Sequence, residues 1–185
     1  MIKPYKISVP KSTLNNIYKK VRSYPWKMMQ NVNGWEYGTN YNYLKKISKY
    51  WVSKYNWKKF ENKINSYKNY KTNVDGINLH FIIEKSKNPK SRPLLLLHGW
   101  PGSVIEFFDI IPRLAHPEQF GGKIEDGFDV IVPSLPGFGF STPIKKALGP
   151  RRIGKILNKF MVKNLGHKNY IVQGGDWGAT IAAWI

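Results

Sequence analysis

An aspartate, Asp176, lies at the centre of the short run 174–178, which follows an apolar segment and has glycines at both ends. A strand that leads through small-x-nucleophile-x-small into a helix is the pattern of a nucleophile elbow, here with Asp in place of Ser. The turn of such an elbow is so tight that side chains at Gly174 and Gly178 would clash. An Asp with an ordinary pKa of about 3.9 is an anion at neutral pH, so it can attack a strained carbon without a base. We therefore predict that Asp176 is a nucleophile; the alternative is an aspartate that only caps a helix.

A second motif, His98-Gly99-Trp100-Pro101, follows a run of four leucines. In hydrolases with a nucleophile elbow, a loop at this place supplies one backbone N–H of the oxyanion hole, and the residue after the nucleophile supplies the other. We therefore predict the backbone N–H groups of Trp100 and Trp177 as the two donors. The catalytic base of such enzymes follows the nucleophile in the chain. His98 is accordingly interpreted as a residue that braces the loop, with Gly99 and Pro101, rather than as the base.

The Pro- and Gly-rich segment 133–141 follows a third apolar run. By itself it predicts only a turn. It gains weight from its order and spacing with the other two motifs, because ligands of parallel α/β sheets bind at the carboxyl ends of the strands.

The elements that would position these motifs alternate between strands and helices. Residues 67–74 and 77–85 are strand-like and are joined by Asp75-Gly76, a pair that suits a tight hairpin. Three further strands are expected at 93–97, 128–132 and 170–173. Helices are expected at 103–115 and 150–165, and a last one begins at 179. This order predicts the α/β class, with a mainly parallel sheet, a leading hairpin and helices on its faces.

The N-terminal third of the chain predicts helices only. Ser12 is expected to cap a first helix, and a second is expected from about Asn40, with a short third one after it. The segment 24–40 has the composition of a loop. Aromatic and aliphatic side chains at helical spacing indicate that these helices pack on another body. We therefore predict two domains, a helical region at 1–66 and the α/β core at 67–185.

The chain has 185 residues, no cysteine and a formal net charge of +19 at pH 7. A disulfide scaffold and a thiolate metal site are therefore excluded, and the four histidines lack metal-ligand spacing, so no metal is expected. Residues 1–90 carry 19 Lys and Arg against 4 Asp and Glu. Such a basic half fits an anionic membrane surface or simply a solvated surface rich in Lys and Asn. No nucleic-acid motif accompanies it, so no nucleic acid is expected as a partner.

The three motifs together resemble the microsomal-type epoxide hydrolases, and within them the insect juvenile hormone epoxide hydrolases. The likeness rests on His-Gly-Trp-Pro-Gly-Ser at 98–103, Ser-Leu-Pro-Gly-Phe-Gly-Phe-Ser at 134–141 and Gly-Gly-Asp-Trp-Gly at 174–178. In the N-terminal region it extends to the segments 4–10 and 35–40 and to Tyr50-Trp51. It thus covers nearly all of residues 2–185 and implies an α/β-hydrolase fold preceded by a helical N-terminal region.

The resemblance implies hydrolysis of a small apolar epoxide to a vicinal diol, without a cofactor. The carboxylate of Asp176 would open the epoxide and form a covalent ester, while two tyrosines of a lid donate to the epoxide oxygen. A His, oriented by an Asp or Glu, would then activate the water that hydrolyses this ester. The oxyanion hole would serve this second step. The family also implies the endoplasmic reticulum or microsomal membrane as the location.

Only Asp176 and the oxyanion hole of this set map onto the sequence. The lid, its tyrosines, the acid and the His have no counterpart before Ile185, and the family's N-terminal anchor has none either. We therefore expect a truncated α/β-hydrolase core from an incomplete gene product. Residues 1–185 alone are expected to accumulate ester without turnover. The strand 170–173 is expected to form an exposed apolar edge that lowers stability.

Two other functions stay open. A dehalogenase with an Asp nucleophile shares the elbow, although the N-terminal region and the run 98–102 favour epoxides. A non-catalytic homologue would use its positive charge to bind a lipid surface or to regulate a partner. A reading frame that continues into a lid and a late His would favour the enzyme.

Overall fold

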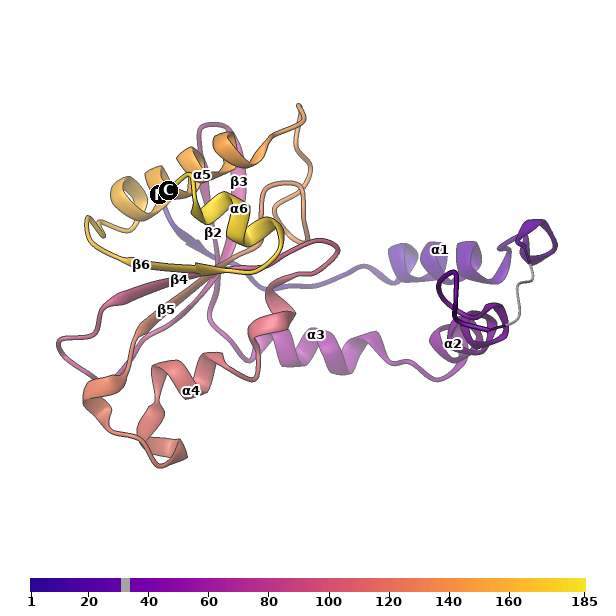
Figure 1. Cartoon of the computed structure of the whole chain (residues 1–185), viewed down its shortest axis with the longest axis horizontal. Helices are drawn as coiled ribbons and strands as arrows, with labels where there is room; N and C mark the ends of the chain where they lie inside the picture. Colours follow the sequence, from indigo (N-terminus) through magenta and orange to yellow (C-terminus); the bar gives the residue numbers. More distant parts are fainter. Residues whose placement is uncertain (31–33) are drawn as a thin grey trace. The chain divides into compact units, whose positions relative to one another are not determined.

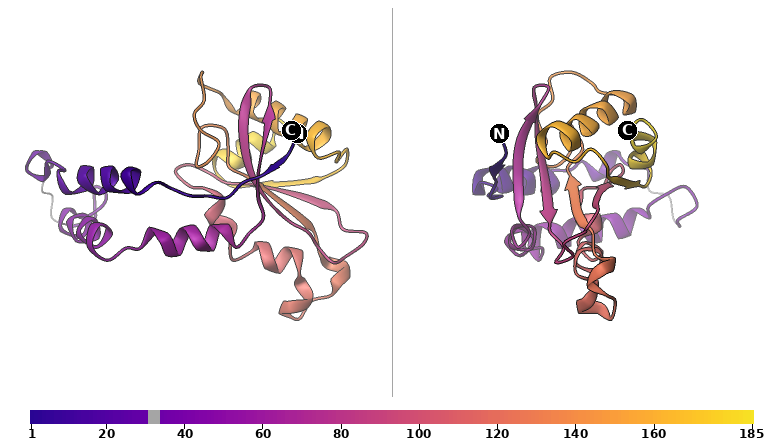
Figure 2. Two further views of the ribbon diagram at one scale, coloured as in Figure 1. Left: turned by 180° about the vertical axis from the view of Figure 1, so that it is seen from behind. Right: turned by 90° about the vertical axis from the view of Figure 1, so that its left-hand side faces the viewer.

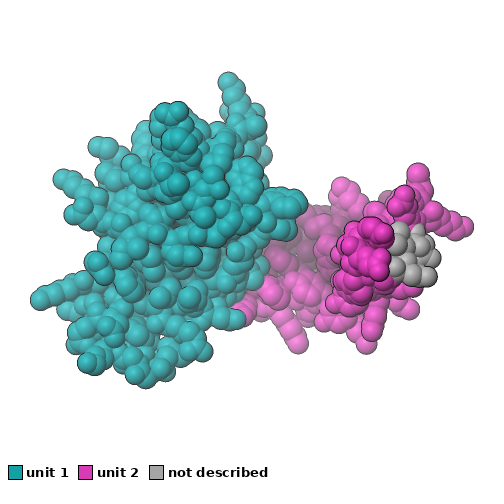
Figure 3. All heavy atoms as spheres, viewed as in Figure 1, with its two compact units in different colours: residues 1–6, 64–185 teal, residues 7–63 magenta. Residues whose placement is uncertain are grey.

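The computed structural model describes residues 1–30 and 34–185. These residues form two compact units, coloured separately in Figure 3. The sheet unit comprises Met1–Lys6 and Ile64–Ile185, and the helical unit comprises Ile7–Lys63. These bounds differ from the predicted division after residue 66 in two respects. The second part of the sheet unit already starts at Ile64. Residues 1–6 also join the sheet unit, because a short strand at Lys3–Pro4 pairs with the hairpin.

The sheet unit contains six strands in the order β1-β2-β3-β5-β4-β6. Their bounds are β1 (Lys3–Pro4), β2 (Asn69–Val74), β3 (Ile77–Glu84), β4 (Pro93–Leu97), β5 (Asp129–Pro133) and β6 (Ile171–Gly174). The first three are antiparallel to their neighbours, whereas β4 lies parallel to both β5 and β6. The predicted α/β class, with a leading hairpin through Asp75-Gly76, is confirmed. β6 lies at one edge of the sheet, as the sequence predicted.

Helices lie on both faces of this sheet (Figure 1). On one face lie α5 (Pro150–Lys159), which continues as a π-helical turn at Phe160–Asn164, and α6 (Trp177–Ala182). The views of Figure 2 also show these two helices, in orange and yellow, side by side. On the other face lies the short α4 (Ile111–Ala115), which packs against β3 and β5.

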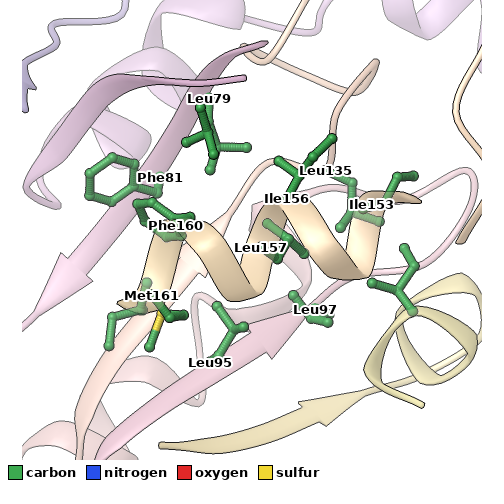
Figure 4. Packing of buried hydrophobic residues seen from close by; sticks show 13 residues of the cluster. Leu79, Phe81, Leu95, Leu97, Leu135, Ile153, Ile156, Leu157, Phe160 and Met161 are labelled. Atoms are coloured by element: carbon green, nitrogen blue, oxygen red, sulfur yellow. The ribbon is translucent and has the colours of Figure 1, made fainter. Parts of the chain in front are cut away.

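The main core lies between α5 and the sheet (Figure 4). Its members from the strands and from α5 with its extension are Val74, Leu79, Phe81, Leu95, Leu97, Ile131, Ile153, Ile156, Leu157, Phe160 and Met161. Leu94 and Leu96 are buried too but do not belong to this cluster, because successive side chains of a strand point to opposite faces. β4 is therefore covered on both sides, which explains its unbroken run of leucines.

The prediction of one continuous helix over 103–115 is wrong. The structure has a 3-10 turn, Val104–Phe107, separate from α4. Ser103 caps this turn in a reciprocal arrangement with Glu106, and Pro112 lies in the first turn of α4. Proline has no N–H to continue a helical ladder, so it favours the start of a new helix over the middle of a long one.

The helical unit contains α1 (Lys11–Arg22), a 3-10 turn (Trp26–Met28), α2 (Tyr41–Ser53) and most of α3 (Trp57–Asn65). Asn40 caps α2 by accepting a hydrogen bond from a backbone N–H, which confirms the predicted start. Ser12 does not cap α1: it lies inside the helix, which begins after Pro10. Part of the predicted loop 24–40, residues 31–33, lies outside the described residues. In the part of the chain that the structure describes, no helix is both long and apolar enough to cross a membrane.

Candidate active site

Asp176 lies between the end of β6 and the start of α6, with an unusual backbone conformation. Its φ is 50° and its ψ is −123°. A positive φ is rare for a residue with a side chain and marks a sharp, strained turn, so it persists only where the surroundings enforce it. Asp176 thus forms the sharp turn between strand β6 and helix α6.

Two glycines allow this turn. A Cβ atom at Gly174 would meet the backbone of Gly178, and a Cβ atom at Gly178 would meet the carbonyl groups of Leu97 and His98. At Gly175, by contrast, no atom lies within 4 Å of an added Cβ. The run thus needs its outer glycines for close backbone packing, whereas Gly175 lies in open space.

The carboxylate of Asp176 is held by backbone. Its Oδ2 accepts a hydrogen bond from the N–H of Trp100 at 2.8 Å. This bond, and then that from the N–H of Trp177, lower the pKa of Asp176 below its ordinary value, whereas partial burial opposes them. The structure thus brings together the three residues predicted as nucleophile and oxyanion donors. The carboxylate is ionised at neutral pH and is exposed to solvent.

The segment 98–102 is shaped to approach this carboxylate. A Cβ atom at Gly99 would lie 2.7 Å from the Cβ of Asp176 and 2.8 Å from its Oδ2. The carbonyl of Gly99 accepts a hydrogen bond from the N–H of Gly102 at 3.0 Å, which closes a turn around Trp100 and Pro101. Trp100 is 67% exposed and Trp177 is 40% exposed, so two large aromatic residues beside the elbow reach solvent.

His98 is fully buried, and both of its ring nitrogens have partners. Nδ1 lies 3.0 Å from the carbonyl oxygen of Gly99, and Nε2 accepts from the N–H of Leu135 at 3.0 Å. Burial is the main cause that lowers the pKa of the ring. Among the residues that the structure describes, no histidine is hydrogen-bonded to Asp176.

A second buried histidine, His80, lies on β3 and had no predicted role. Its Nδ1 lies 2.9 Å from the hydroxyl of Ser134, and its Nε2 lies 3.0 Å from Oδ1 of Asn69. Its backbone N–H donates to the hydroxyl of Ser141, which in turn donates to the carbonyl of Ser134. Burial, with a smaller effect of Lys71, lowers the pKa of His80 to about 3. This network fixes both ends of the segment 133–141. In the sequence, only the presence of a histidine within the apolar run of β3 could have indicated it.

Comparisons with known families agree with this geometry. The family model described as "Epoxide hydrolase N terminus" matches residues 2–107. The model described as "alpha/beta hydrolase fold" matches residues 92–185. Together the two matches cover residues 2–185.

Individual proteins show the same likeness. The chain is 38% identical over 184 residues to juvenile hormone epoxide hydrolase 1 of Ctenocephalides felis, with 97% of this chain and 39% of that protein covered. It is 38% identical over 187 residues to epoxide hydrolase 1 of Oryctolagus cuniculus, with 97% and 40% covered. The crystal structure of juvenile hormone epoxide hydrolase from the silkworm Bombyx mori matches with a TM-score of 0.84 at 35% identity, over 100% of this chain and 44% of that one. The chain thus spans about two fifths of the length of these relatives.

Proposed function

Because the chain belongs to the epoxide hydrolase family and has its α/β-hydrolase fold, we propose that Asp176 is the nucleophile in the conversion of an epoxide and water to a vicinal diol. The observation that carries this proposal is the position of its carboxylate. One oxygen is held by a backbone N–H, while the side chain as a whole faces solvent at the tip of the elbow. A nucleophile needs this combination, since it must be fixed in direction and open to its substrate.

In the first step, the free carboxylate oxygen of Asp176 attacks an epoxide carbon. A new C–O ester bond forms while the ring C–O bond breaks, and the released oxygen takes up a proton from an acid group. Because the ring is strained, its C–O bond breaks under attack by a carboxylate. The carboxylate is already an anion and needs no base to activate it. Exposed indoles at Trp100 and Trp177 suit a small apolar substrate. The family assigns the proton donors to lid tyrosines, and none of these maps onto the described residues.

In the second step, water attacks the carbonyl carbon of the ester. The carbonyl oxygen then becomes an oxyanion, and the N–H groups of Trp100 and Trp177 are placed to stabilise it because they already bind the carboxylate. The family assigns activation of this water to a His with an acidic partner. His98 does not suit that role, because it is buried and both of its nitrogens have partners.

Intact-mass measurement tests the first step in the 185-residue chain. After incubation with excess styrene oxide, we expect a stable gain of one epoxide mass, located by peptide mapping at Asp176. The variant Asp176→Asn should show no such gain, and the control Asp126→Asn should behave like the wild type. An unmodified mass in the wild type, or labelling that survives in Asp176→Asn, would overturn the proposal.

A dehalogenase would form the same ester from a haloalkane, with halide as the leaving group. The match of the N-terminal family model over residues 2–107 supports epoxides instead. Incubation with 1-chlorobutane under the same conditions distinguishes the two reactions. We expect no ester and no released chloride from the haloalkane; an ester formed faster from it than from the epoxide would favour dehalogenation.

A second candidate function, binding to an anionic membrane surface, is supported by the helical unit taken alone. Residues 7–63 carry twelve Lys and Arg and only two Asp and Glu. The same unit has an apolar groove between α1 and α2, to which the half-exposed Tyr50 and Trp51 contribute. Basic side chains beside exposed aromatic ones suit a membrane interface. An endoplasmic reticulum or microsomal location, which the family implies, would agree with such binding.

Co-sedimentation with vesicles tests this second function. We expect the chain to bind phosphatidylserine-containing vesicles at low salt and to lose that binding on pure phosphatidylcholine. The triple variant of Lys45, Lys46 and Lys49 to Glu should bind more weakly than a control with the same charge change at Lys123, Lys145 and Lys146. Equal binding by the two triple variants would mean that net charge alone, and not the helical unit, is responsible.

A further inference from the structure

The buried ring of His98 connects two segments that are far apart in the sequence, the end of β4 and the segment 133–141. It follows β4, its Nε2 contacts the backbone of Leu135 in the segment 133–141, and its Nδ1 contacts the carbonyl of Gly99. The ring of Phe138 packs against it edge-on, with 5.4 Å between ring centroids. The ring is therefore held by two hydrogen-bond partners and by one aromatic neighbour.

These partners determine which nitrogen carries the proton. The backbone N–H of Leu135 can only donate, so Nε2 must be the unprotonated acceptor. The carbonyl of Gly99 can only accept, so Nδ1 must carry the hydrogen. The ring is thus the neutral Nδ1–H tautomer, since a doubly protonated ring would direct a hydrogen at the N–H of Leu135. Burial, which lowers the pKa of His98, acts in the same direction.

The carbonyl that receives this hydrogen belongs to the peptide group that also holds the N–H of Trp100. A trans peptide group is planar, and its C=O and N–H point in opposite directions. The carbonyl of Gly99 accepts from His98 on one side, while the N–H of Trp100 donates to Asp176 on the other. The direction of the carbonyl therefore fixes the direction of the N–H.

We propose that His98 is a positioning residue, whose neutral Nδ1–H tautomer holds the Gly99–Trp100 peptide group so that the N–H of Trp100 points at the carboxylate of Asp176. This inference rests on the proposed function, in which the N–H of Trp100 serves as an oxyanion donor. Hydrogen bonds through His98 also join the donor to the segment 133–141 at Leu135. The placement of the donor thus depends on a loop that does not itself touch Asp176 through a hydrogen bond.

Two substitutions separate the two contacts of the ring. In His98→Asn, the side-chain NH₂ takes the place of Nδ1 and can still donate to the carbonyl of Gly99. In His98→Gln, the amide oxygen takes the place of Nε2 and can still accept from Leu135. The side-chain donor to Gly99 is lost, which leaves only the N–H of Gly102 on that carbonyl. His80→Asn is a matched control, because His80 is equally buried and holds the same segment 133–141 without contacting Gly99.

The readout is the pKa of Asp176, measured by carbon-13 NMR of the carboxyl group in the 185-residue chain. We expect this pKa to rise toward its ordinary value in His98→Gln, and to remain near the wild-type value in His98→Asn and His80→Asn. In the wild type, nitrogen-15 shifts of the imidazole should show a protonated Nδ1 and a bare Nε2. A proton on Nε2, or a pKa of Asp176 that is unchanged in His98→Gln, would overturn the inference.

Loss of stability alone does not produce the expected pattern. If the pKa of Asp176 rises as much in His80→Asn as in His98→Gln, the effect comes from loosening of the segment 133–141, and the positioning role is wrong. The measurement needs no epoxide, so it is independent of ester formation. A wild type that fails to form the ester would overturn the proposed function, while the pKa series would still report whether His98 orients the peptide group.

Discussion

The backbone N–H of Trp100 lies 2.8 Å from Oδ2 of Asp176, although 76 positions separate the two residues in the sequence. The pairing of β4 with β6 explains this contact. These strands are parallel and adjacent, and Leu97 lies opposite Gly174 in their register. The segments that follow the two strands therefore leave the same edge of the sheet side by side. A shift of the register by one residue would reverse the faces of β6 and separate the two partners.

A methyl group at Gly178 is expected to destabilise the sheet unit. The added carbon would meet the carbonyl groups of Leu97 and His98, which are backbone and cannot rotate away. Overpacking of this kind costs about 1–3 kcal/mol, so Gly178→Ala should lower the free energy of unfolding in urea by that amount. Gly175→Ala is the control, because an added carbon there meets no atom within 4 Å, and its effect should stay within about 0.5 kcal/mol. Equal losses in the two variants would contradict the close backbone contact.

A methyl group at Gly99 is expected to impair the chemistry more than the fold. It would lie 2.7 Å from the Cβ of Asp176, so the carboxylate or the loop must shift. Misplacement of a reacting group by about 1 Å costs about 100-fold in rate, and the formation of the ester in Gly99→Ala should slow by that factor. Time-resolved intact mass with styrene oxide measures this rate. Gly149→Ala, where an added carbon meets no atom within 4 Å, should react like the wild type; an unaffected Gly99→Ala would mean that the site tolerates the shift.

The elbow could be predicted from the sequence because its physical requirements are local. A tight turn with a nucleophile at its tip needs small residues at fixed offsets, a strand before it and a helix after it. All of these lie within about 15 consecutive residues, and Asp176 is found where they meet, with a φ of 50°. The strand β4 was equally clear, because a strand covered on both faces must be apolar throughout.

The network of His80 could not be predicted in the same way. Its partners Asn69 and Ser134 are 11 and 54 positions away, and only the pairing of β3 with β2 and β5 brings them together. The cap of α1 was missed for a different reason. Ser12 has the right residue type for a cap, but Pro10 already fixes a backbone φ of −59° at the point where the helix begins.

The buried ring of His80 is expected to make the stability of the sheet unit depend on pH. Its pKa is about 3 in the folded state, against an ordinary value of 6.5 when unfolded. The unfolded state therefore binds a proton first as the pH falls. The contribution of His80 is complete above about pH 6.5 and is lost progressively between pH 6.5 and pH 3. Urea unfolding at several pH values should show this decline in the wild type and a flatter profile in His80→Asn. A decline that is equally steep in the variant would assign it to other groups.

Glu61 in the helical unit is expected to produce a second pH dependence, in a lower window. The residue is only 2% exposed, and its Oε2 accepts from the N–H of Val9 at 2.7 Å and from the indole N–H of Trp57 at 3.0 Å. The hydrogen bond from Lys58, followed by that from Val9, lowers the pKa of Glu61 to about 2, against an ordinary value of 4.5. The carboxylate thus holds the segment before α1 to α3 within this unit.

As the pH falls, the unfolded state binds a proton at Glu61 before the folded state does. The contribution of Glu61 to stability is therefore complete above about pH 4.5 and is lost as the pH falls toward 2. Trp57 should report this loss through its fluorescence, because its indole N–H donates to the carboxylate. Glu61→Gln should remove the transition, while Glu36→Gln, at an exposed carboxylate of the same unit, should leave it in place. The same acid transition in Glu61→Gln would mean that the segment before α1 is held by other contacts. A transition that also disappears in Glu36→Gln would point to the overall charge of the unit rather than to this buried carboxylate.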